Sequence, residues 1–173
     1  MKYFIITFLM LSFYFTSTAQ TDPEFPQEFI MHIKLHNGMV TNFGGASPDL
    51  YTGGVQLIPQ YTIIAHLLRV GIVADGFYTS KKLQASAGPT ASIKLKTFRV
   101  KPFGSAGNLF LNIDHLWGTQ QQRLLGGGIN ADLGNKIVIA LSAHRDYNLN
   151  TWWLQNSLSL RISKVKKRSS PFN

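Results

Sequence analysis

The stretch LQASAGPTASIKLK, residues 83–96, decides the fold class. Its apolar set is Leu83, Ala85, Ala87, Ala91, Ile93 and Leu95, and its polar set is Gln84, Ser86, Thr90, Ser92, Lys94 and Lys96. The two sets alternate, and a period of two places successive side chains on opposite faces of a β-strand. The stretch therefore predicts a long strand with one apolar and one polar face.

The same alternation recurs from about residue 28 to residue 162 and predicts eight strands in all. Turn-forming residues separate the strands. They stand at Asn37-Gly38 and onward to Asp49, at Ser80-Lys81-Lys82, at Pro102-Phe103-Gly104 and at Gly134-Asn135. Short turns join antiparallel neighbours. We expect residues 37–50 to be the long connection at one end and residues 98–107 the sizeable connection at the other.

Formal charges are confined to one side of this pattern. The predicted apolar faces hold no Lys, Arg, Asp or Glu, and their polar exceptions are His115 and Asn156. The opposite faces carry Lys34, Arg69, Asp75, Lys94, Lys96, Asp114, Asp132, Asp146 and Arg161. A lipid-facing surface requires such a separation, because a cation at the bilayer midplane costs about 2–4 kcal/mol. Closure into a barrel pairs every strand edge. We predict an all-β, eight-stranded, antiparallel up-and-down transmembrane barrel whose polar lumen is filled by side chains.

A soluble, secreted lipocalin-like barrel is the alternative, because it has the same alternation with the apolar set lining a ligand pocket. Two features favour the membrane. Only 14% of the residues are charged, whereas a soluble surface carries about 25–35%. In an up-and-down order, one rim also receives Tyr51, Tyr78, Trp117, Tyr147 and Trp152. A ring of Tyr and Trp at one level is typical of a membrane interface.

The N-terminal residues 1–19 have the layout of a cleavable secretory signal peptide. Lys2 precedes the apolar stretch Tyr3 to Phe15, and the small residues Ser17 and Ala19 follow it. The stretch is shorter than the roughly 20 residues that a spanning helix needs. We expect a mature domain of residues 20–173, with its strands within about 28–162 and a short basic tail at 163–173.

The secretion signal, the eight alternating segments and the aromatic rim together resemble the small eight-stranded outer-membrane β-barrel proteins of Gram-negative bacteria. The resemblance covers about residues 28–162 and is one of pattern. It implies a location in the cell outer membrane. In that group the last strand commonly ends in an aromatic residue. Here Leu158, Leu160 and Ile162 match the alternation, but a basic cluster of Lys164, Lys166, Lys167 and Arg168 follows. Members of the group are structural anchors, adhesins, small-molecule sensors or, less often, lipid-modifying enzymes.

Residues that could support catalysis or metal binding are spaced unfavourably. Ser142, His144 and Asp146 share a strand face, but neighbours in this set lie about 6.5–7 Å apart, too far for direct hydrogen bonds. His32 and His36 lie about 13 Å apart. Gly126-Gly127-Gly128 lacks the Lys-Ser/Thr ending of a phosphate loop, and it more plausibly admits bulky neighbours across the lumen. We therefore predict no catalytic, cofactor-binding or metal-binding residues and a non-enzymatic protein. A lipid-modifying enzyme that uses Ser142 or His144 is the less favoured alternative.

Partners are predicted from charge and loop length. The chain carries 17 Lys and Arg against 8 Asp and Glu, a formal net charge of +9, and it has no cysteine. The basic tail lacks interleaved aromatic residues, which argues against nucleic acid and favours anionic lipid head groups. We expect outer-membrane lipid as a partner and a structural or interaction role, with the 37–50 loop as the possible contact for a partner protein. An eight-stranded barrel encloses only enough room for side chains, so a wide pore is not expected.

Overall fold

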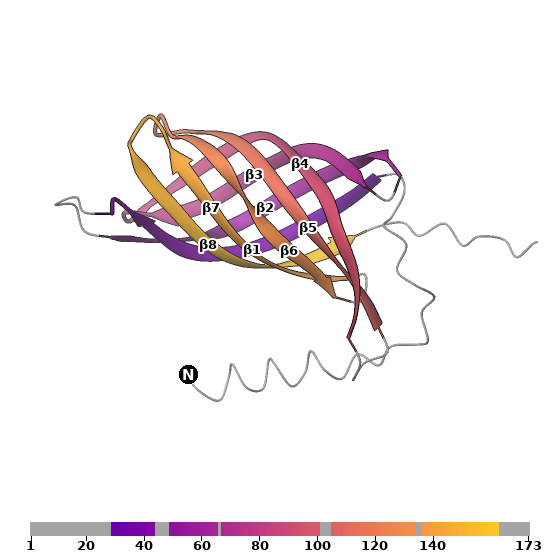
Figure 1. Ribbon diagram of the computed structural model, residues 1–173. Helices are drawn as coiled ribbons and strands as arrows, with labels where there is room; N and C mark the ends of the chain where they lie inside the picture. Colours follow the sequence, from indigo (N-terminus) through magenta and orange to yellow (C-terminus); the bar gives the residue numbers. More distant parts are fainter. Residues whose placement is uncertain (1–28, 44–48, 66, 101–104, 134–135, 163–173) are drawn as a thin grey trace, which may run out of the picture.

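The computed structural model describes residues 29–43, 49–65, 67–100, 105–133 and 136–162 (Figure 1). The elements are β1 (Phe29–Thr41), β2 (Leu50–Ile64), β3 (Leu68–Thr79), β4 (Lys82–Val100), β5 (Ser105–Gly118), β6 (Arg123–Leu133), β7 (Ile137–Asp146) and β8 (Thr151–Ile162). No helix among these residues is long and apolar enough to cross a membrane. The predicted signal peptide, the basic tail and His66 lie outside the described residues.

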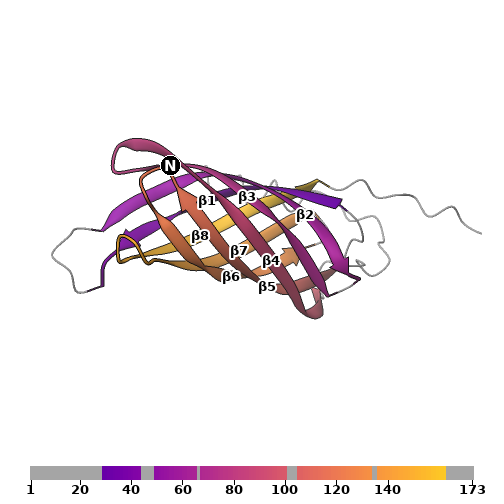
Figure 2. The ribbon, with the colours of Figure 1, turned by 90° about the horizontal axis from the view of Figure 1, so that it is seen from above.

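The eight strands form one closed barrel in sequence order, and two side views turned by 90° show strongly tilted strands (Figures 1 and 2). Each strand pairs antiparallel with the next, and β1 closes the barrel against β8. At mid-strand, Lys34 of β1 faces Gln56 of β2 on one side and Ser159 of β8 on the other. The predicted all-β, eight-stranded antiparallel barrel is confirmed.

Two predicted connections are shorter in the structure. Residues 37–41 belong to β1 and pair with β2, so the long connection spans 42–49 and not 37–50. Gly38 is not a turn residue: it lies so close to β8 that a Cβ there would be 1.9 Å from the Leu154 carbonyl oxygen. Likewise β4 extends to Val100 and β5 begins at Ser105, which shortens the predicted 98–107 link. The turn at Ser80-Lys81 is as predicted, with positive φ at both residues, as a tight hairpin requires.

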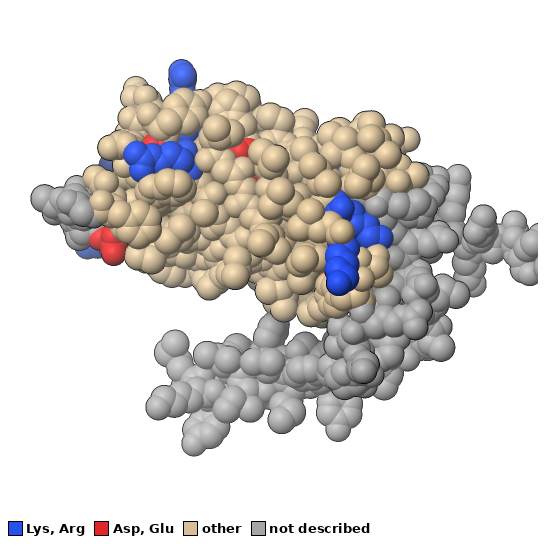
Figure 3. Space-filling view, viewed as in Figure 1, with Lys and Arg blue, Asp and Glu red and all other residues tan. Residues whose placement is uncertain are grey.

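The alternation is oriented with its apolar set outside. Large apolar side chains are exposed on every strand, including Leu35, Val55, Ile72, Leu95, Ile113, Ile129, Leu141 and Leu160. The polar set points inward and is buried. On the face shown in Figure 3, Lys and Arg lie toward the two ends and a broad uncharged area separates them. This orientation contradicts the lipocalin-like alternative, which needs the apolar set to line the interior.

Lys96 departs from the predicted faces because of a β-bulge. Between Lys94 and Lys96 the register of β4 against β5 shifts, with Lys94 opposite the buried Phe110 and Lys96 opposite Leu109. An extra residue in one strand reverses the faces that follow it. Lys96 is therefore exposed on the outer side, and the prediction that it faces the lumen was wrong.

An apolar layer crosses the lumen near the end that carries the aromatic rim. Its buried residues include Val40, Phe77, Leu116, Leu124 and Trp153. The rings of Phe77 and Trp153 meet edge to face with centroids 5.2 Å apart. Trp152 thus points to the outer surface of β8, and Trp153 points into the layer. Sequence reasoning assigned only Trp152 and missed this interior layer.

Candidate functional site

The candidate site is the polar interior, where ionised side chains of both signs are buried together. The buried cations are Lys34, Arg69 and Arg161, and the buried carboxylates are Asp75, Asp114, Asp132 and Asp146. These seven were among the nine charges predicted to face the lumen. Buried charges are tolerated when they are paired and hydrogen-bonded. The near balance of signs therefore offsets part of the cost of burying these charges.

One His–Asp pair joins β1 to β3 across the intervening strand. His36 Nε2 lies 2.9 Å from Asp75 Oδ1, and the Gln56 side-chain amide donates to Asp75 Oδ2 at 3.1 Å. Both side chains of this pair are buried. The contact crosses β2 at Gly54, where a Cβ would come within 2.7 Å of His36 Nε2. The missing side chain of Gly54 therefore provides the space through which the imidazole passes.

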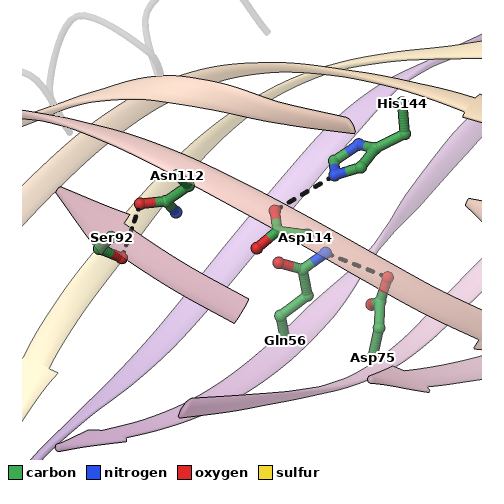
Figure 4. Close-up of polar contacts among 6 residues, drawn as sticks. All are labelled: Gln56, Asp75, Ser92, Asn112, Asp114 and His144. Atoms are coloured by element: carbon green, nitrogen blue, oxygen red, sulfur yellow. Dashed lines mark hydrogen bonds and ion pairs between the residues drawn. The ribbon is translucent and has the colours of Figure 1, made fainter. Parts of the chain in front are cut away.

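A second His–Asp pair repeats this arrangement between β5 and β7. His144 Nε2 lies 3.2 Å from Asp114 Oδ2 (Figure 4). In the register, Gly126 of β6 stands between them, opposite Asp114 on one side and His144 on the other. The interpretation that the glycine run admits bulky neighbours across the lumen fits this geometry. In the sequence, such a His–Asp pair is marked by a glycine on a polar face with a titratable residue on each neighbouring strand. This mark can be recognised only once the strand register is known.

Hydrogen bonds connect further strands around these pairs. Ser92 Oγ donates to Asn112 Oδ1 at 2.8 Å, which links β4 and β5 (Figure 4). Gln60 donates to Ser92 Oγ at 2.9 Å, which adds β2 to this link. Lys34 is buried within electrostatic reach of Asp75 and Asp114, the carboxylates of the two His–Asp pairs. The Lys34 side chain therefore lies among the carboxylates of both His–Asp pairs.

Toward the end opposite the aromatic rim, the interior holds a second charged group. Arg161 of β8 forms an ion pair with Asp132 of β6. Arg69 of β3 is buried and lies within electrostatic reach of both. His32 of β1 lies near the same cations, Arg69 and Arg161, and near Lys34. Buried polar and charged side chains therefore line the interior from this end to the apolar layer, together with apolar ones such as Ile30, Phe110 and Val138.

The residues considered for catalysis do not assemble into a nucleophilic site. His144 is engaged with Asp114, while Ser142 Oγ has no hydrogen-bond partner among the described residues. Asp146 points inward and accepts backbone N–H groups of Arg123, Asn148 and Leu149, so it holds the β7–β8 turn. His32 and His36 face inward separately. In the described part of the chain, no three His, Asp or Glu side chains are grouped to hold a metal ion.

The outer surface bears the predicted aromatic rim. Tyr51, Tyr78, Trp117 and Tyr147 are exposed, and Trp152 is partly exposed, all at the end where β1, β3, β5 and β7 finish. Phe29 and Tyr61 are exposed as a paired couple near the other end. His115 and Asn156 face outward as predicted, and the His115 ring bonds to the Tyr147 hydroxyl at 2.9 Å. Asp114 and His115 therefore point to opposite sides of β5.

Comparison with known proteins identifies the fold and no family. No protein-family model matches the sequence, and no curated protein matches it. Among solved structures, the chain is similar to one described as "De novo design of transmembrane beta-barrels", with a TM-score of 0.50 and 10% sequence identity. The similarity covers 80% of this chain and 99% of the designed chain. At this identity the likeness concerns the fold alone.

Proposed function

We propose that this protein is an integral β-barrel of the bacterial outer membrane with a structural or interaction role. The observation that carries the proposal is the orientation of the barrel, with a charge-poor apolar surface outside and paired charges inside. In water this arrangement would expose large apolar side chains on all eight strands. In a bilayer the same surface faces hydrocarbon, and closure satisfies the strand backbones.

The aromatic rim supports a membrane location independently of the apolar surface. Tyr and Trp are favoured at the level of the lipid head groups because their rings are amphipathic. The outward-facing Arg123 and Arg145 lie at this rim, beside Trp117 and Trp152 in the strand register. Cations next to interfacial aromatic residues fit the level of the lipid phosphates, between the hydrocarbon and the water.

A wide pore is not part of the proposal. This part of the proposal is supported by the edge-to-face contact of Phe77 and Trp153 in the apolar layer near one end and by the buried charged groups beyond it. Interaction with other proteins would then use surfaces at the barrel ends, and the connection at 42–49 is the longest candidate. The lipid-modifying alternative gains no support from Ser142, which does not contact His144. We propose a non-enzymatic role.

Cell fractionation and gel migration test the membrane proposal. The full-length protein should sediment with the outer membrane, resist carbonate extraction, and migrate faster on a detergent gel before boiling than after it. Recovery in the soluble periplasm without detergent would contradict the proposal. Lipid profiles of strains with Ser142→Ala or His144→Ala test the enzymatic alternative, and a changed lipid profile would contradict the non-enzymatic role.

A further inference from the structure

Two arginines and four aromatic rings gather on the outer surface at the aromatic rim, over β5 to β8. We call this group the arginine–aromatic patch, and its members are Arg123, Arg145, His115, Trp117, Tyr147 and Trp152. Neither arginine takes part in the interior network of charges. Figure 3 shows Lys and Arg atoms at this end of the barrel, beyond the uncharged middle.

Arg145 is directed outward because both of its neighbours on β7 are buried inside. His144 and Asp146 are each at most 2% exposed and face the lumen. The Arg145 guanidinium carbon lies 5.3 Å from the centre of the Trp152 ring, and the side chain also donates to the Asn150 side-chain oxygen. These contacts hold the guanidinium at the outer surface, while its planar fork keeps further N–H groups for an acceptor.

Arg123 lies diagonally next to Arg145 on the neighbouring strand. Arg145 pairs with Leu125, which is two residues from Arg123 along β6 and on the same face. Diagonal neighbours of this kind have Cα atoms about 7–8 Å apart, within reach of long side chains. Arg123 is exposed, stands opposite Trp117, and its carbonyl accepts the Tyr147 backbone N–H at 3.1 Å. Two guanidinium groups can therefore converge on one anion.

Three of the aromatic members lie in contact with one another, and Trp152 lies apart from them beside Arg145. The His115 ring lies 4.4 Å from the Trp117 ring and bonds to the Tyr147 hydroxyl at 2.9 Å. Asp146, the neighbour of Arg145 on β7, is fully buried, and its Oδ1 accepts the backbone N–H groups of Arg123, Asn148 and Leu149. The carboxylate therefore bonds to backbone on the inner side, while the two arginine side chains face the outer surface.

We propose that the arginine–aromatic patch binds the phosphate of an anionic lipid head group. The inference rests on the proposed membrane location and adds a site to it. Arginine recognises phosphate oxygens through paired N–H groups, and the aromatic members place the site at the level where lipid phosphates lie. A zwitterionic lipid presents the same phosphate with a cation attached, so the two arginines favour a lipid of net negative charge.

Native mass spectrometry of the detergent-solubilised protein tests the site. The probe is an equal mixture of phosphatidylglycerol and phosphatidylcholine with the same acyl chains. We expect the wild type to retain phosphatidylglycerol preferentially and the Arg123→Gln/Arg145→Gln variant to lose this preference by about 30-fold, since each cation near the surface contributes a factor of about 5. The matched control is Lys81→Gln/Lys82→Gln, which removes two charges from the same end of the barrel, where β3 and β4 meet. It should behave like the wild type.

The other outcomes of these experiments would overturn either the lipid site or the membrane location. An equal loss in both double variants would mean diffuse attraction and no site. Equal retention of the two lipids by the wild type would also overturn the site. Displacement of the lipid by millimolar inorganic phosphate would overturn it as well, because it would indicate a free anion as the ligand. Flotation with phosphatidylcholine vesicles separates the two proposals: a wild type that does not float contradicts the membrane location, whereas one that floats without discriminating lipids contradicts the site alone.

Discussion

Leu141→Arg is the most informative single substitution for the membrane proposal. Leu141 lies in the middle of β7, is 67% exposed, and has Ile129 and Asn156 as its neighbours across the sheet. Arg145, the outward residue beside Trp152, is four residues away, a distance of about 13 Å along the strand. The new guanidinium would therefore lie in hydrocarbon and would reach the rim only at the expense of its rotamer freedom.

The expected magnitude depends on the solvent around the barrel. In a bilayer, Leu141→Arg should lower the free energy of unfolding by about 2–4 kcal/mol. Leu83→Arg is the matched control, because Leu83 is 81% exposed and follows the β3–β4 turn at the rim. An interfacial arginine costs about 0–1 kcal/mol. Around a water-soluble barrel both substitutions would change stability by about 0.5 kcal/mol or less.

Urea unfolding of the protein in phosphatidylcholine vesicles, followed by tryptophan fluorescence, measures both values. The difference between the two losses is more informative than either alone, because a general destabilisation by arginine contributes equally to both and cancels. Equal losses at Leu141 and Leu83, or no loss at Leu141, would refute the assignment of the apolar surface to hydrocarbon.

Three further predictions concern the interior. Gly126→Ala should destabilise the barrel by about 1–3 kcal/mol by overpacking, since a Cβ there would lie 2.1 Å from a backbone oxygen. The control Gly76→Ala has open space around its Cβ and should be neutral or stabilising. Equal urea midpoints for the two variants would contradict the overpacking at Gly126. Asp114→Ala should lower stability by about 1–3 kcal/mol because it leaves the buried His144 ring without its hydrogen-bond partner, and a second substitution, His144→Ala, should then add little in a double-mutant cycle. Phe77→Ala should cost about 3–5 kcal/mol and raise ion leakage across planar bilayers, and unchanged leakage would show that the apolar layer does not close the lumen.

The control for the last prediction is Tyr78→Ala on the same strand. Tyr78 follows Phe77 but faces outward and is half exposed. Its loss removes an aromatic side chain from the rim and leaves the interior layer intact. Leakage should therefore rise in the Phe77 variant and not in the Tyr78 variant. A rise in both would assign the effect to general loosening of the barrel.

The sequence determined the number of strands, their antiparallel order and the composition of the two faces. A period of two is a local property of the chain, so Leu35 and Lys34, or Ile113 and Asp114, can be assigned to opposite faces without knowing any neighbour. The aromatic rim also followed from the sequence, because an up-and-down order fixes which strand ends meet. Asn37-Gly38 misled this reasoning, since a glycine that admits a neighbouring backbone looks the same in sequence as a glycine in a turn.

Only the tertiary structure decided which residues meet inside the barrel. Periodicity is unchanged when a barrel is turned inside out, so the sequence prediction of an outward apolar face rested on the low charge and the aromatic rim, and the exposed position of Leu141 agrees with it. The His36–Asp75 and His144–Asp114 contacts each depend on the register of three strands and on a glycine in the middle one, and the exposure of Lys96 depends on a bulge. Such features are set by pairing between distant segments, which a single strand does not encode.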